Sequence, residues 1–120
     1  MNSQGYPDMG NGRYSALLPY AQWLNFNNAQ RAHYNMIESS GPLLATMMGV
    51  GFIRPKIAAA CGFIYGIGRI AYGFGYASKY GADGRLVGAI ISEFSLLGLM
   101  GLSFYDGARV VGLLPLFKKK

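Results

Sequence analysis

Three long apolar stretches, separated by short polar connections, occupy most of the chain. The clearest is 86–105, which is 20 residues long and carries a single charge, Glu93. About 20 apolar residues span the hydrocarbon core of a bilayer. Stretches 25–52 and 55–78 are also long enough to cross it. Backbone groups in lipid must be hydrogen-bonded internally, so each stretch is predicted to be helical. The pattern therefore predicts an all-α integral membrane bundle with three transmembrane helices.

The ends of these helices are indicated by proline and by polar turns. Stretch 25–52 is polar in its first half and apolar in its second, and Pro42 near its middle predicts a kink. Pro55 follows Arg54 in a basic turn and is well placed to begin the second helix. The Asp106-Gly107 pair is predicted to end the third helix. Two small-xxx-small pairs, Gly62 with Gly66 and Gly84 with Gly88, would permit close helix crossings.

The chain is expected to divide into an irregular polar head, residues 1–24, and a transmembrane domain, residues 25–120. The head contains glycine and proline and lacks the basic and apolar segments of a secretory signal. Basic residues are concentrated in the Arg54–Lys56 turn and in the last three lysines. The positive-inside rule therefore places these two segments in the cytosol, or in the matrix of a mitochondrion.

Composition supports a membrane protein and argues against several other classes. Hydrophobic residues make up 52% of the chain and charged residues 13%, about half the share in soluble domains. The net charge is +6, but no basic run is interleaved with aromatic residues, so anionic headgroups are favoured over nucleic acid. The lone cysteine, Cys61, forms no intrachain disulfide or zinc site, and we expect no metal centre.

Polar side chains inside the predicted helices are the candidates for chemistry, because charges in a membrane are costly and mark functional sites by default. Two sets recur at helical spacing: one from the first helix and one from the second, on the same side of the membrane. Their spacing predicts a polar groove of cations, an amide, a carboxylate and phenols. The sets are Arg31, Asn35 and Glu38, and Arg69, Tyr72 and Tyr76.

A purely structural interpretation of the same residues is also open. Arg31 with Glu38, and Arg69 with Glu93, would then be buried ion pairs that only fix helix packing. The tyrosines would form an aromatic belt at the membrane surface.

Two segments resemble the MAPEG family of membrane proteins, in particular the type 3 branch of microsomal glutathione transferases. Segment 26–38 (FNNAQRAHYNMIE) is similar to the family's "FNxxQRxHxNxxE" motif. Segment 55–76 is similar to the motif of its next helix, with Pro55, Gly62 and the run GRIAYGFGY. The resemblance covers roughly residues 26–102.

This resemblance implies a four-helix protomer that forms a homotrimer and binds glutathione between subunits. It places Arg31, His33, Asn35, Glu38, Arg69, Tyr72 and Tyr76 at glutathione-binding positions. It makes Tyr72 and Arg85 the candidates for catalysis, with Arg85 corresponding to the arginine that activates the thiolate.

Three departures from the family pattern shape the expected function. The family's first transmembrane helix is expected to be lacking, Ser39 stands where a tyrosine is common, and Glu93 adds a carboxylate that would disfavour a thiolate. The favoured interpretation is therefore a structural accessory subunit of a large complex, with other membrane proteins and lipids as partners. Its expected location is the mitochondrial inner membrane, with the endoplasmic reticulum as the alternative. The alternative functions are an active glutathione transferase or peroxidase, and a module that binds phospholipid or quinone.

Overall fold

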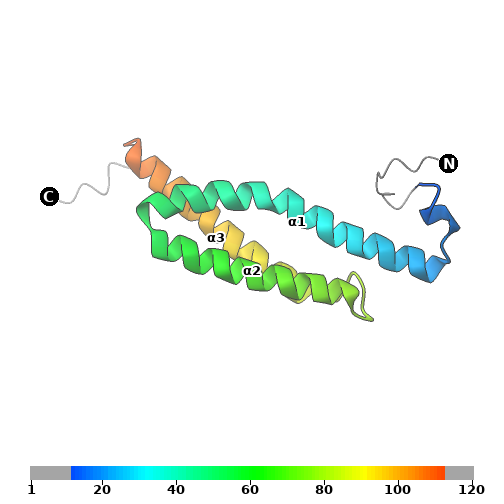
Figure 1. The fold of residues 1–120 in the computed structure, drawn as a ribbon. Coiled ribbons are helices and arrows are strands. Elements are labelled where there is room, and N and C mark those ends of the chain that lie inside the picture. The colour runs from blue at the N-terminus through cyan, green and yellow to red at the C-terminus, as the bar shows by residue number, and fades with distance from the viewer. Residues whose placement is uncertain (1–11, 113–120) are drawn as a thin grey trace.

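The computed structural model describes residues 12–112 and consists of three long helices in one bundle (Figure 1). A turn and a short 3-10 helix, η1 (Ser15–Leu17), precede α1 (Tyr20–Ile53). Arg54 alone separates α1 from α2 (Pro55–Ala77), and a turn connects α2 to α3 (Leu86–Val110). All three helices are long and apolar enough to cross a membrane, so the predicted all-α bundle with three spans is confirmed.

The first helix is longer than a bilayer requires. At about 1.5 Å per residue, the 34 residues of α1 extend about 51 Å, whereas the hydrocarbon core is about 30 Å thick. Its N-terminal part projects beyond the loop between α2 and α3 (Figure 1). The helix begins at Tyr20, five residues before the expected start, and Tyr20 stacks on Trp23 with ring centroids 6.0 Å apart. Residues 1–11 of the predicted head lie outside the described residues.

The two prolines singled out in the sequence lie within α1 and at the start of α2. Pro42 lies inside α1, which stays helical throughout and changes direction near its middle (Figure 1). Pro55 occupies the first turn of α2, where its missing N–H costs no hydrogen bond.

The predicted end of the third helix at Asp106-Gly107 is wrong, since α3 continues to Val110. Asp106 is buried rather than at a solvated helix end, and its carboxylate accepts two hydrogen bonds from the Arg54 guanidinium, at 2.9 and 3.0 Å. This ion pair attaches the turn between α1 and α2 to α3. The three lysines at the C-terminus lie outside the described residues.

The second and third helices approach each other through glycine. A Cβ added to Gly88 would collide with the backbone of Tyr72, and one added to Gly68 would meet the Ser92 nitrogen at 2.7 Å. Gly84 similarly lies against the backbone of Gly75. The predicted pair Gly84 and Gly88 therefore lies in this crossing, which we call the glycine seam.

The other predicted pair of small residues behaves differently. A Cβ at Gly62 would meet the Met47 side chain, and one at Gly66 would meet nothing within 4 Å. Farther than the glycine seam from the turn that joins α2 to α3, the Ser95 hydroxyl on α3 donates to the Cys61 carbonyl on α2, at 2.6 Å.

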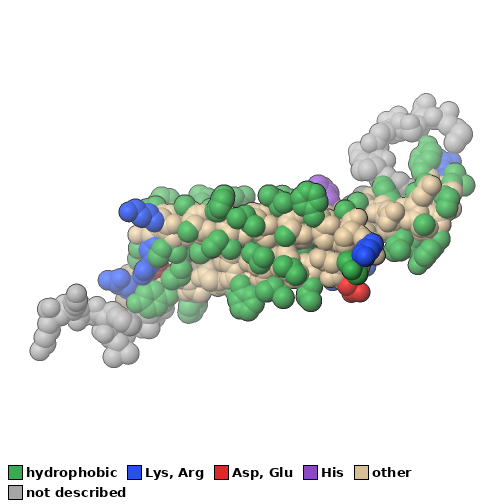
Figure 2. Space-filling model, turned by 90° about the horizontal axis from the view of Figure 1, so that it is seen from below, with side chains coloured by type: hydrophobic (Ala, Val, Ile, Leu, Met, Phe, Trp, Pro, Cys, Tyr) green, Lys and Arg blue, Asp and Glu red, His purple; other side chains and the backbone are tan. Residues whose placement is uncertain are grey.

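Most large apolar side chains point away from the bundle. The exposed fractions of Phe52, Phe63, Phe74, Phe94 and Phe104 all exceed 70%. The apolar core is small by comparison and centres on Val50, Ala58 and Leu99. An outer surface more apolar than the interior is what lipid contact requires, and Figure 2 shows such side chains along the length of the bundle.

Candidate functional site

A polar cavity lies between α1, α2 and the start of α3, at the end of the bundle toward the N-terminus. Its volume is about 280 Å³. It brings together six residues that the sequence placed in the groove or its catalytic set, and it adds Tyr34. The lining residues are Arg31, Tyr34, Asn35, Glu38, Tyr72, Tyr76 and Arg85.

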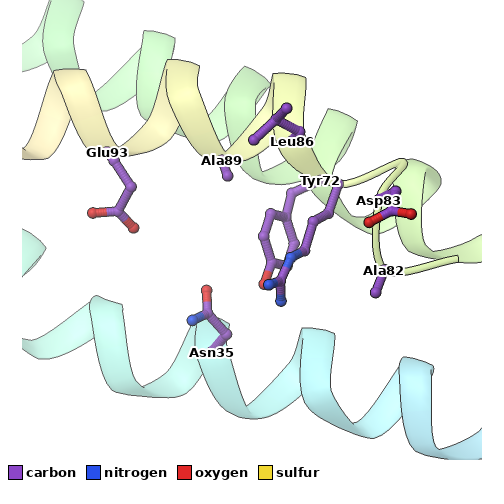
Figure 3. A pocket seen from close by; sticks show the side chains of 8 residues that line it. Asn35, Tyr72, Ala82, Asp83, Leu86, Ala89 and Glu93 are labelled. Carbon is purple, nitrogen blue, oxygen red and sulfur yellow. The ribbon is translucent and has the colours of Figure 1, made fainter.

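A second, larger cavity of about 550 Å³ adjoins the first, since Asn35, Tyr72 and Arg85 line both. Figure 3 shows Asn35 on α1 facing Tyr72 on α2, with the carboxylate of Glu93 pointing from α3 into the same gap. We call these two adjoining cavities together the cleft. The further lining residues of the larger cavity are Ala82, Asp83, Leu86, Ala89 and Glu93.

The tyrosines of the cleft face inward. Tyr72 and Tyr76 are each 4% exposed, and their rings meet edge to face with centroids 5.2 Å apart. They therefore do not form an aromatic belt at the membrane surface. Both hydroxyls belong to the second helix, where i, i+4 spacing places them on one face.

Arg85 reaches into the cleft from the N-terminal end of α3. Its guanidinium donates a hydrogen bond to the Tyr76 hydroxyl and lies 5.2 Å from the centroid of that ring. Burial alone would lower the pKa of Arg85, but the Tyr76 and Tyr72 hydroxyls outweigh burial and raise it above its usual value. Arg85 therefore stays cationic at every physiological pH.

Arg69 is placed behind the cleft rather than in its lining. It is 8% exposed, and its Nη1 donates to Asn35 Oδ1 at 2.7 Å, while its guanidinium lies 4.4 Å from the Tyr72 ring centroid. Its Nε is buried without a hydrogen-bond partner. Arg69 thus holds two lining side chains, Asn35 and Tyr72, in position.

The ion pairs of the structural interpretation do not form within residues 12–112. Arg69 pairs with the amide of Asn35 instead of Glu93, and Arg31 and Glu38 line one cavity without bonding to each other. The ion pair in the described chain is Arg54 with Asp106, at the opposite end.

His33, one of the expected site residues, does not line the cleft, and some lining residues were missed. His33 is exposed on a different face of α1, because it stands two positions from both Arg31 and Asn35. Ser39 contacts α2, where the Tyr65 hydroxyl donates to its Oγ at 2.6 Å. Leu86, Ala89 and Glu93 were not grouped in advance, although their i, i+3, i+7 spacing marks one face of α3.

The fold and this cleft define an integral membrane helical protein with a polar site between its helices. A comparison with known families matches residues 2–105 to the MAPEG family, and the chain belongs to that family. The match includes much of the polar head, which the motif resemblance over 26–102 left out. No solved structure matches the chain. Members of the family are generally associated with glutathione.

Proposed function

We propose that this protein binds glutathione in the cleft and activates its thiol for transfer to an electrophile or for peroxide reduction. One observation carries the proposal: Asn35, Tyr72 and Arg85, from three different parts of the chain, line both cavities of the cleft. Polar groups inside a membrane bundle are energetically costly, and such groups therefore mark a functional site by default.

The chemistry of the lining residues suits the groups of glutathione, which are two carboxylates, one ammonium and one thiol. Arg31 can hold a carboxylate through paired N–H donors. Glu38 can accept from the ammonium group. Asn35 offers an amide whose oxygen is already fixed by Arg69, so its N–H₂ group is left to donate.

Thiol activation is assigned to Arg85 and Tyr72. A cation and a hydroxyl donor beside a thiol lower its pKa and favour the nucleophilic thiolate. Because the pKa of Arg85 is raised in the folded protein, its positive charge is lost only in strong alkali. A change in activity near neutral pH would therefore not report Arg85.

The first test is glutathione binding to the purified protein, measured by calorimetry. Arg85→Gln removes one charge-assisted contact and should weaken binding about tenfold or more. Lys79→Gln removes an exposed charge near the same loop and should leave binding unchanged. Equal affinity in wild type and Arg85→Gln, or no binding in wild type, would refute the proposal.

A second candidate is a structural accessory subunit of a large membrane complex, as the sequence departures favoured. Glu93 supports it, because this carboxylate lines the same cavity as Arg85 and Tyr72 and would oppose a thiolate. If glutathione binds, Glu93→Gln should increase the fraction present as thiolate, because the opposing carboxylate is removed. The thiolate would be measured by its ultraviolet absorbance. If wild type instead binds no glutathione and purifies in stoichiometric amounts with other membrane proteins, the subunit role is favoured.

Location and assembly belong to the same proposals. The subunit role predicts the mitochondrial inner membrane, whereas the transferase role is compatible with the endoplasmic reticulum and with a homotrimer. Cell fractionation followed by a native gel and mass spectrometry separates these outcomes. A bound phospholipid or quinone in place of glutathione would appear in the same mass spectrum.

A further inference from the structure

We propose that the end of the bundle opposite the cleft binds the headgroup of an anionic glycerophospholipid. This end, which we call the basic end, comprises the Arg54 turn, Lys56 at the start of α2 and Arg109 in the last turn of α3. Figure 2 shows basic side chains gathered there, at the end away from the polar head. The inference is independent of the proposed glutathione site.

The ion pair between Arg54 and Asp106 brings together the basic residues of the turn after α1, of α2 and of α3. Lys56 follows Arg54 by two positions, and Arg109 lies on the face of α3 that carries Asp106, because the two are three residues apart. The turn between α1 and α2 and the C-terminal end of α3 therefore meet at one surface (Figure 1).

The charges at this end do not cancel. Asp106 neutralises Arg54, whereas Lys56 and Arg109 are exposed and form no ion pair with a carboxylate of the described chain. The first turn of α2 contains no acidic residue that would offset Lys56.

Exposed apolar side chains lie close to the basic residues along the chain. Phe52 precedes Arg54 by two positions and Phe104 precedes Arg109 by five, and they are 86% and 81% exposed. A phosphate held by Lys56 and Arg109 would therefore have its acyl chains against an apolar surface. Charge complementarity and apolar contact together favour a phospholipid over a free phosphate ion.

The test is native mass spectrometry of the full-length protein in detergent, titrated with phosphatidylglycerol against phosphatidylcholine. Wild type should prefer the anionic lipid. Lys56→Gln combined with Arg109→Gln should weaken phosphatidylglycerol binding about thirtyfold, which corresponds to about 2 kcal/mol for two basic residues near a membrane surface. Both side chains are exposed, so the fold should be retained.

A matched control removes one lysine and one arginine elsewhere. Arg13→Gln combined with Lys79→Gln takes the same charge from exposed positions away from the basic end, and should leave the lipid preference unchanged. Loss of preference in both double variants would show a net-charge effect and overturn the site. Equal binding of glycerol phosphate, which has no acyl chains, would identify an anion site and also overturn the proposal.

Discussion

The arginines that donate side-chain hydrogen bonds have different kinds of partner at the two ends of the bundle. At the basic end, Arg54 makes two hydrogen bonds to the buried carboxylate of Asp106. At the cleft end, Arg69 donates to the amide of Asn35, and Arg85 donates to a tyrosine hydroxyl. An arginine that is paired with a carboxylate serves the fold, because its charge is cancelled. An arginine with neutral partners keeps its charge, and of the two only Arg85 lines the cleft, where an anionic ligand could reach it.

Disrupting the glycine seam should have the largest effect and should act at the cleft end. In Gly88→Leu the new side chain collides with the backbone of Tyr72, so α2 and α3 must separate. We expect the free energy of unfolding to fall by about 3 kcal/mol or more, measured by circular dichroism during denaturation in mixed micelles. Gly98→Leu adds the same side chain where nothing lies within 4 Å, and a change beyond about 0.5 kcal/mol would contradict this explanation.

Breaking the ion pair should have the next largest effect and should act at the basic end. Asp106→Asn removes the charge that cancels Arg54, so the unfolding midpoint should fall. Adding Arg54→Gln should recover part of the loss, because the guanidinium then no longer lacks its carboxylate. Asp83→Asn, an exposed acid outside any ion pair of residues 12–112, is the control. No recovery in the double variant would show that the pair is not coupled.

Changing the neutral partner of Arg69 tests the cleft end more gently. Asn35→Ala removes the acceptor of a buried guanidinium and should cost about 1–3 kcal/mol of unfolding free energy. Asn35→Asp supplies a carboxylate acceptor and should restore stability, but the cancelled charge should weaken glutathione binding. Equal stability of the alanine and aspartate variants would show that Arg69 does not depend on this contact.

The smallest effect concerns the hydroxyl that links α1 to α2. Ser39→Ala leaves the Tyr65 hydroxyl without its acceptor and should cost about 1 kcal/mol in the same unfolding measurement. Ser40→Ala removes a hydroxyl whose bond is to Ile37 in its own helix, and it should be nearly neutral. Similar losses in both variants would indicate a change in α1 itself.

Much of the fold could be predicted from the sequence, because hydropathy and proline act locally. The three spans and the start of α2 at Pro55 follow from composition and from the missing proline N–H. The end of α3 could not be predicted in this way. Asp-Gly is typical of a helix break, but the long-range pairing of Asp106 with Arg54 overrides that local preference.

The candidate site shows the same division. The i, i+4, i+7 spacing of Arg31, Asn35 and Glu38 correctly put them on one face, and all three line one cavity. The structural interpretation paired Arg69 with Glu93, and this was wrong because Arg69 donates to Asn35 instead. The register between the helices decides which of the two residues comes within reach of Arg69. That register depends on the glycine seam, whose longer spacing between Gly68 and Gly75 was not recognised.

The glycine seam also constrains how this sequence can change over generations. In an ordinary core, a larger side chain on one helix can be accommodated when a neighbour becomes smaller. Where Gly88 meets the backbone of Tyr72 and the carbonyl of Gly68, the neighbour has no atoms left to lose. A larger residue there cannot be compensated by a smaller neighbour. The seam should therefore accept one only if α2 and α3 move apart, which would also change the shape of the cleft between them.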